Sequence, residues 1–158
     1  MGKEIERKFL IKETEWNSFA KPEGKLLRQG YLVSDPNKTI RVRTTENAAW
    51  ITIKGISTGA SRLEYEYEIP LKEGLELLDQ FAESELEKIR YEIPHEGKIW
   101  EVDVFSGDNA GLIVAEIELE SEEENFQLPA WVAEEVTHEK KYYNSCLTIH
   151  PYKSWTPR

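Results

Sequence analysis

Three charged side chains near the start of the chain share one spacing. Glu4, Glu6 and Lys8 alternate with Ile5 and Phe9 in the stretch KEIERKFLI. Successive side chains of a β-strand point to opposite faces, so a strand here would carry two carboxylates and an amine on one face. Carboxylates are ligands that hard cations prefer, and an amine binds anions. The spacing therefore indicates that one strand presents all three groups to a single ligand.

The same alternation of charged and apolar residues recurs along the chain. Charged residues fall on one strand parity, and Ile, Val, Leu and Tyr fall on the other. ITIK (51–54) ends in the single charge of Lys54. The other segments carry basic or acidic pairs: IRVR (40–43), RLEYEYEI (62–69), KIRYEI (88–93), EVDVF (101–105) and AEIELE (115–120).

A half-buried antiparallel sheet with a solvated outer face would also alternate in this way. Periodicity alone favours that simpler interpretation. However, the charged faces are segregated by sign, whereas a solvated surface more often mixes uncharged polar residues among its charges. Like charges two residues apart on one face also repel unless something binds them. Both features favour a ligand site.

Composition narrows the class of protein. The 158 residues suit one domain spanning residues 1–158, and 39% of them are apolar. The net charge of −10 argues against a nucleic-acid partner, since such binding relies on phosphate neutralisation. A single cysteine excludes an intrachain disulfide. With neither a signal peptide nor an 18-residue apolar run, we expect a cytoplasmic protein without a membrane partner.

Turn-forming segments divide the chain into mostly strands, with few helices. We expect a helix over 71–82, a short turn over 13–19 and a last helix over 138–147. The predicted strands are 3–11, 26–33, 39–45, 49–54, 62–69, 87–93, 98–105 and 112–120. This order predicts an α+β, mainly β domain built on an antiparallel sheet.

The charged segments together resemble the CYTH superfamily, the triphosphate tunnel metalloenzymes. EIERKF carries that family's Glu-x-Glu-x-Lys motif, and the later segments follow in the family's order over nearly the whole chain. They are LRQGYL (27–32), IRVR (40–43), ITIK (51–54), EYE (64–66), EKIRY (87–91), EVDVF (101–105), AEIE (115–118) and HEKKYYN (138–144).

The resemblance implies a closed eight-stranded antiparallel β-barrel with a charged interior and a few flanking helices. It reverses the simpler orientation, because the charges would face a central tunnel and the apolar residues would face outward. An eight-stranded barrel has room for a small ligand. So many charges around one cavity are costly to desolvate unless they pair with one another or a ligand occupies the cavity. A triphosphate with divalent metals would supply partners for both signs of charge.

The resemblance also implies roles for individual residues. Mg²⁺ or Mn²⁺ would be held by the acidic pairs Glu4 and Glu6, and Glu116 and Glu118. Glu64, Glu66 and Asp103 are secondary metal ligands or partners that orient the cations. The substrate-binding cations are Arg41, Arg43, Lys54, Lys88 and Arg90.

Two further positions are linked to water handling and to one end of the barrel. Lys8 and Tyr31 are candidates for orienting or deprotonating the attacking water, with Gln29 on the same face as Tyr31. Lys8 would serve if neighbouring cations lowered its pKa, although it is equally suited to bind phosphate. Packing at a barrel end is the simpler role for Tyr31. Lys140 would line one end from the last helix, sharing a face with Asn144.

The functional hypothesis is metal-dependent hydrolysis of a triphosphate, above all inorganic tripolyphosphate. Class IV adenylate cyclase and thiamine or nucleoside triphosphatase are the alternatives within the enzyme class. A non-catalytic polyphosphate- or nucleotide-binding module is the alternative outside it. Binding alone needs mainly the cations, so the two acidic pairs and Lys8 disfavour the last. A homodimer that covers outward apolar faces is also an expectation.

Overall fold

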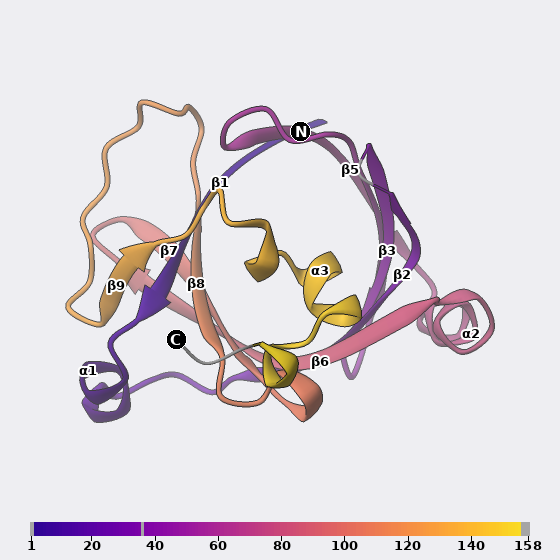
Figure 1. Cartoon of the computed structure of the whole chain (residues 1–158), viewed down its shortest axis with the longest axis horizontal. Coiled ribbons are helices and arrows are strands. Elements are labelled where there is room, and N and C mark those ends of the chain that lie inside the picture. Colours follow the sequence, from indigo (N-terminus) through magenta and orange to yellow (C-terminus); the bar gives the residue numbers. More distant parts are fainter. Residues whose placement is uncertain (1, 36, 156–158) are drawn as a thin grey trace.

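The computed structural model describes residues 2–35 and 37–155, which form a closed antiparallel barrel (Figure 1). Its strands run in the order β5-β4-β3-β2-β6-β7-β8-β1, and a further β5–β1 pairing closes the ring. A ninth strand, β9, extends the sheet beside the second half of β1. The strands are β1 (Gly2–Ile11), β2 (Lys25–Asp35), β3 (Lys38–Thr44), β4 (Ala49–Lys54), β5 (Ser61–Ile69), β6 (Ser84–His95), β7 (Lys98–Phe105), β8 (Ile113–Glu118) and β9 (Val132–Glu135).

The strand register places the charged side chains of each strand on the face that lines the barrel interior. Directly opposed residues of an antiparallel pair point to the same face. Lys8 lies opposite Glu116, and Arg90 lies opposite Asp103, so charged residues meet charged residues across strand after strand. The eight-stranded barrel with a charged interior is therefore confirmed, and the simpler orientation with charges on the outside is wrong.

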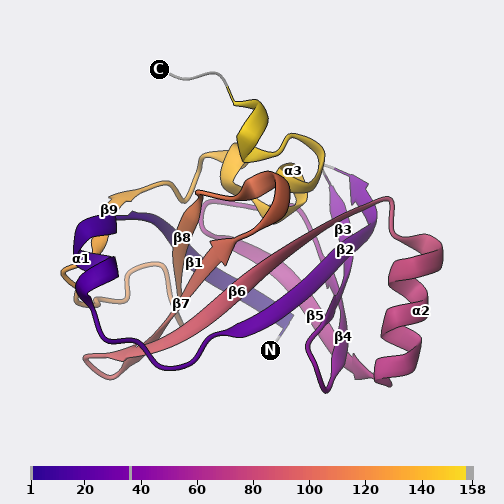
Figure 2. The same cartoon turned by 90° about the horizontal axis from the view of Figure 1, so that it is seen from below.

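The main apolar core lies outside the barrel wall rather than within it. The outward side chains of β1, β6, β7 and β8 are covered by α1 (Glu13–Ser18), β9 and the connection over 119–131 (Figure 2). Trp16, Trp100 and Trp131 are fully buried there and meet in edge-to-face contacts at 5.3 and 5.9 Å. Such aromatic packing adds about 0.5–1.5 kcal/mol per pair beyond area burial. It makes this half of the wall a rigid support for the interior charges.

Helix α2 (Leu71–Phe81) covers the opposite side of the wall, over β2, β3 and β4. Glycine permits its close approach at two points. A Cβ on Gly74 would lie 2.4 Å from the Ala49 Cβ, and one on Gly30 would lie 2.8 Å from Leu78. The contact at Gly30 fixes β2 at the segment that carries Gln29 and Tyr31.

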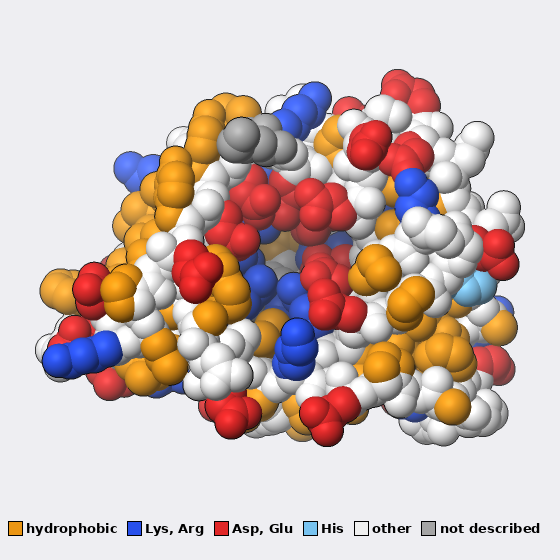
Figure 3. All heavy atoms as spheres, turned by 180° about the vertical axis from the view of Figure 1, so that it is seen from behind, with side chains coloured by type: hydrophobic (Ala, Val, Ile, Leu, Met, Phe, Trp, Pro, Cys, Tyr) orange, Lys and Arg blue, Asp and Glu red, His pale blue; other side chains and the backbone are white. Residues whose placement is uncertain are grey.

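Beyond the part of β4 that α2 covers, no described segment covers the outer face of β4 and β5. Ile53, Leu63, Tyr65 and Tyr67 stand on it with 40–57% of their surface exposed. Apolar side chains gather at this side of the barrel, toward the left edge of Figure 3. No described helix is long and apolar enough to span a membrane.

The C-terminal segment departs most from the sequence prediction. The helix expected over 138–147 is wrong: α3 spans only Asn144–Ile149, after a 3₁₀ turn at Lys140–Tyr142. Lys140 and Asn144 therefore do not share a helical face. β9 was not predicted, because four residues are too short for a period-two signal. The other strands and helices match their predicted positions to within three residues at each end.

Candidate functional site

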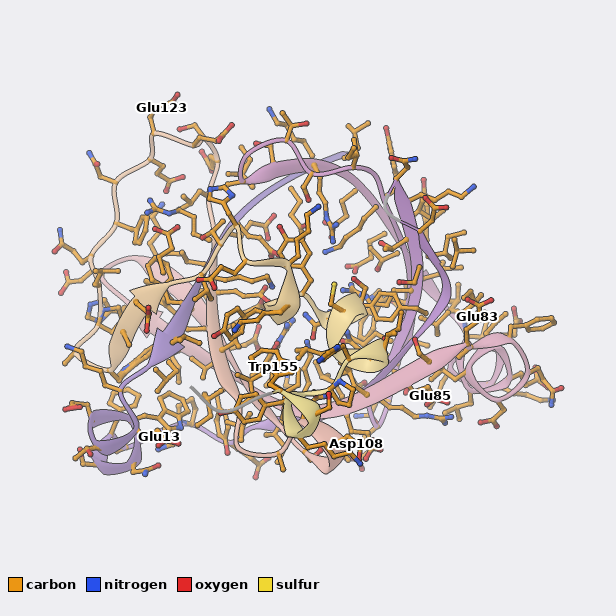
Figure 4. The ribbon with its side chains drawn as sticks, viewed as in Figure 1. Glu13, Glu83, Glu85, Asp108, Glu123 and Trp155 are labelled. Carbon is orange, nitrogen blue, oxygen red and sulfur yellow. The ribbon has the colours of Figure 1, made fainter. Side chains whose placement is uncertain are left out.

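A cavity of about 180 Å³ occupies the barrel interior. From the side opposite α3, Figure 3 shows a hollow whose walls carry acidic and basic side chains next to one another. The side chains labelled Glu13, Glu83 and Glu123 in Figure 4 lie at the periphery, away from this interior. Twelve of the fifteen predicted site residues line the cavity: Glu4, Glu6, Lys8, Tyr31, Arg41, Arg43, Lys54, Glu64, Glu66, Arg90, Glu116 and Glu118.

Strands β1 and β8 form an acidic wall. Glu6 lies directly opposite Glu118, and Glu4 and Glu116 lie one step away on the same face. Burial, together with Glu116, raises the pKa of Glu6 to about 7. Burial, Glu4 and Glu6 also raise the pKa of Glu118. Buried carboxylates placed this close repel one another, and a divalent cation bound between them would relieve that repulsion.

Lysines already engage part of the acidic wall. Lys54 Nζ lies 2.9 Å from a Glu4 oxygen, and Lys8 Nζ lies 2.6 Å from a Glu116 oxygen. Among the described residues, no group of three His, Cys, Asp or Glu side chains is arranged for metal binding. Among the described residues Glu118 has no ion pair, and Glu6 has only a longer contact with Lys8 at 3.6 Å. These two carboxylates are therefore the more available for a cation, and the lysines would have to shift for Glu4 or Glu116 to join them.

Lys8 lies among carboxylates rather than cations. Its amine is buried, 2.6 Å from Glu116 and 3.6 Å from Glu6. Burial alone would lower the pKa of Lys8, but Glu116 and Glu6 outweigh it and raise that pKa above its ordinary value. The expected lowering by neighbouring cations is therefore wrong. Lys8 is a permanent positive charge at the acidic wall, which suits it to contact an anion and not to remove a proton.

The basic wall is built from the arginines of β3 and β6. Arg90 is held by two hydrogen bonds to Asp103, at 2.8 and 2.9 Å, and Arg41 donates to Thr52. The Nε of Arg41 is buried, and no described residue accepts a hydrogen bond from it. A buried donor without an acceptor is unfavourable by about 1–3 kcal/mol, and an anion in the cavity would supply the missing acceptor.

Lys88 and Asp103 lie behind the cavity wall rather than on it. Lys88 is 0% exposed, and its amine contacts Asp103 at 2.8 Å and the Asn144 amide oxygen at 2.9 Å. Burial, with Arg90 and Arg43 nearby, lowers the pKa of Lys88 to about 7. Asp103 therefore supports two cations, and Lys88 connects the wall to the C-terminal segment.

The C-terminal segment closes one end of the cavity with residues that were not predicted. Thr137, Tyr143, Asn144 and Ser145 line it, whereas Lys140 is exposed and lies outside the lining. No periodic signal marks this segment, since it is neither a strand nor a long helix. Arg62 and Glu101 also line the cavity, and their place on the charged strand parity could have identified them.

Comparison with known proteins agrees with this geometry. The CYTH domain matches residues 2–146. The chain belongs to the CYTH family. A CYTH relative from Acetivibrio thermocellus named inorganic triphosphatase is 49% identical over 156 residues, covering 98% of this chain and 99% of that protein. A relative of the same name from Nitrosomonas europaea is 36% identical over 92% of this chain and 97% of its own.

Solved structures share the CYTH fold. The crystal structure of an inorganic triphosphatase superposes with a TM-score of 0.62 at 32% identity, covering 98% of this chain and 97% of that one. A Pyrococcus horikoshii structure, at 19% identity and a TM-score of 0.57, shares the fold over 75% and 79% of the two chains. Membership of this metalloenzyme family implies dependence on a divalent metal, and the acidic wall fits one because carboxylate oxygens are the ligands hard cations prefer.

Proposed function

We propose that this protein hydrolyses inorganic tripolyphosphate to pyrophosphate and orthophosphate with the help of Mg²⁺ or Mn²⁺. The observation that carries the proposal is one cavity with an arginine-rich wall facing a carboxylate wall. An arginine fork suits phosphate oxygens, and carboxylates suit the cations that accompany polyphosphate. Two relatives named inorganic triphosphatase, one of them 49% identical, support the same substrate.

The size of the cavity favours a compact substrate. Pockets for drug-sized ligands commonly span about 300–1,000 Å³, whereas this cavity holds about 180 Å³. Arg41, Arg43 and Arg90 would bind and orient the phosphate chain along one wall. A base or a thiazole ring would have to extend beyond this cavity, so tripolyphosphate is the substrate that the cavity can take up most completely.

Each wall would make a separate contribution to hydrolysis. Phosphoryl transfer is catalysed mainly by positioning and by neutralising charge. A bound divalent metal would supply further neutralisation of phosphate charge, held by Glu6 and Glu118 and, once their lysines shift, by Glu4 and Glu116. Lys8 would stabilise negative charge that develops on the reacting phosphate. Tyr31, which lines the cavity from β2, remains the candidate for orienting the attacking water.

We further propose the domain organisation, the location and the assembly of the protein. Residues 1–158 act as one domain, and the enzyme works in the cytoplasm without a nucleic-acid or membrane partner. Two copies pair through the uncovered face of β4 and β5.

A substrate panel tests the proposal. The purified protein is incubated with Mg²⁺ and tripolyphosphate, ATP, thiamine triphosphate or pyrophosphate, and the orthophosphate and cyclic AMP produced are measured. We expect the highest kcat/KM on tripolyphosphate and little release from pyrophosphate, which is too short to reach all the cations. Formation of cyclic AMP and pyrophosphate from ATP would instead favour the cyclase, and binding without any turnover would favour the non-catalytic module.

A further inference from the structure

One cation of the cavity wall differs from all the others in its partner. Lys8, Arg41, Lys54, Arg62 and Arg90 each have a carboxylate within 4.0 Å. Arg43 has none in the part of the chain that the structure describes. Its hydrogen-bond partner is a neutral amide, because Arg43 Nε donates to the Gln29 side-chain oxygen at 3.0 Å. Arg43 is thus the least neutralised positive charge on the wall.

Gln29 is placed to hold this arginine without touching a ligand. Its side chain is 0% exposed and does not line the cavity, whereas Arg43 does. Gln29 and Arg43 are direct cross-strand partners on β2 and β3. The close contact of α2 with Gly30 fixes the adjacent backbone, so the amide has little freedom to move.

The same amide also reaches Tyr31. Arg43 can only donate, so the Gln29 oxygen must face it and the Gln29 NH₂ group must face the other way. That NH₂ group donates to the Tyr31 hydroxyl oxygen at 3.3 Å. Because this oxygen accepts from Gln29, its own proton is free to point into the cavity that Tyr31 lines.

From this geometry we propose that Gln29 is a positioning residue: it holds Arg43 by a neutral acceptor, which leaves the guanidinium charge for the substrate, and it turns the Tyr31 hydroxyl proton into the cavity. The inference rests on the proposed function for the identity of the substrate. It deepens that function by explaining how the wall binds a polyanion before a metal neutralises it. Burial, with Arg41 and Arg90 nearby, lowers the pKa of Arg43 to about 9, and the more distant Asp103 does not outweigh them.

Two substitutions separate this role from simple packing. Gln29→Glu keeps the shape but gives Arg43 a carboxylate, which neutralises it. Gln29→Met keeps most of the volume but removes both hydrogen bonds and leaves Arg43 charged. A packing role predicts that the better shape match, Gln29→Glu, is the milder change. If Gln29 instead positions Arg43 as a neutral acceptor, Gln29→Glu should weaken substrate binding more than Gln29→Met. Gln80→Glu, on the exposed surface of α2, is the matched control for the added charge.

The test measures tripolyphosphate binding by calorimetry in EDTA, where turnover is not supported, and thermal unfolding of each variant. We expect Gln29→Glu to weaken binding about 100-fold and Gln29→Met about tenfold. The first variant neutralises the Arg43 charge that contacts the substrate, whereas the second only leaves that charge less well oriented. Thermal stability should follow the opposite order, with Gln29→Met the less stable. Gln80→Glu should bind as the unmodified protein does.

Equal or tighter binding by Gln29→Glu than by Gln29→Met would overturn the inference. If Gln29→Glu does not fold, unchanged affinity in Gln29→Met would overturn it alone. Phosphate release by the unmodified protein is measured in parallel with Mg²⁺. Absence of release from tripolyphosphate would refute the proposed function, whereas release combined with the wrong order of affinities would refute only the role of Gln29.

Discussion

Replacing Lys8 by Met should reveal that this lysine stabilises the acidic wall as well as serving the reaction. The Lys8 amine lies 2.6 Å from Glu116, and both side chains are less than 10% exposed. At an effective dielectric constant near 20, the attraction over that distance is about 6 kcal/mol, and desolvation of both ions offsets much of it. Removing one partner of a buried pair typically costs about 3 kcal/mol or more, because it leaves the other charge unpaired.

The expected loss for Lys8→Met at pH 7 is therefore about 3 kcal/mol in the free energy of unfolding, or about 6–12 °C in Tm for a chain of this size. The loss should shrink as the pH falls. Lys8, with Arg90 and Lys88, holds the pKa of Glu116 well below its ordinary value against burial. Without Lys8, that pKa should rise, and a carboxyl with a raised pKa binds a proton in the folded state and regains stability at lower pH.

Thermal unfolding of Lys8→Met, Glu116→Gln and the double variant at pH 7 and pH 5 measures this coupling. The double variant should be more stable than Lys8→Met, since it no longer buries the Glu116 carboxylate without its lysine partner. Lys12→Met, at an exposed position just after β1, is the control and should shift Tm little. An unchanged Tm for Lys8→Met, or a loss that grows from pH 7 to pH 5, would refute the ion-pair argument. On tripolyphosphate we expect kcat to fall about 100-fold.

Three further predictions concern the metal, pH and assembly. Glu118→Gln should weaken Mg²⁺ binding by at least about tenfold in calorimetry, with unchanged affinity contradicting its role as a ligand. Because the pKa of Glu6 is raised to about 7, the affinity for Mg²⁺ should fall as the pH drops below about 7, as the protonated carboxyl cannot bind metal; a flat profile would contradict this. Each copy of the chain carries a net charge of −10, so two copies repel except where uncharged surfaces meet. They should therefore pair through the uncharged outer face of β4 and β5. Tyr67→Lys should convert a dimer to a monomer in analytical ultracentrifugation, and a monomeric unmodified protein would refute the pairing.

The strand parity made most of the barrel predictable. Period-two patterns and the turn-forming segments between them located all eight barrel strands, and the order of motifs indicated that the charges face inward. Periodicity could not decide that orientation by itself, since a solvated sheet has the same pattern. Arg7, on the other parity, does point outward, where it pairs with Glu135 of β9.

The sequence could not predict which charged side chains lie behind the cavity wall, or which residues close the end of the cavity. Lys88 has the same parity as Arg90, yet it is buried against Asp103 and Asn144 because the C-terminal segment packs over that end. Lys140 is close in sequence to residues that line the cavity, but a 3₁₀ turn directs it to solvent. Strand parity predicts which face of the sheet a side chain points to. Whether that side chain reaches the cavity also depends on the segment that closes the end of the barrel. The pKa of Lys8 was mispredicted for another reason: the register between β1 and β8 places Glu116 opposite it rather than a cation.

The most direct test of the account follows tripolyphosphate by ³¹P NMR in the presence of Mg²⁺. For the unmodified protein we predict one pyrophosphate and one orthophosphate for each tripolyphosphate consumed. Glu6→Gln, on the acidic wall, and Arg41→Gln, on the basic wall, should each lower the rate by about 100-fold or more while leaving the protein folded. Glu13→Gln, on the outside at α1, should leave the rate unchanged. Undiminished turnover in either wall variant, or no cleavage by the unmodified protein, would contradict a reaction carried out between the two walls.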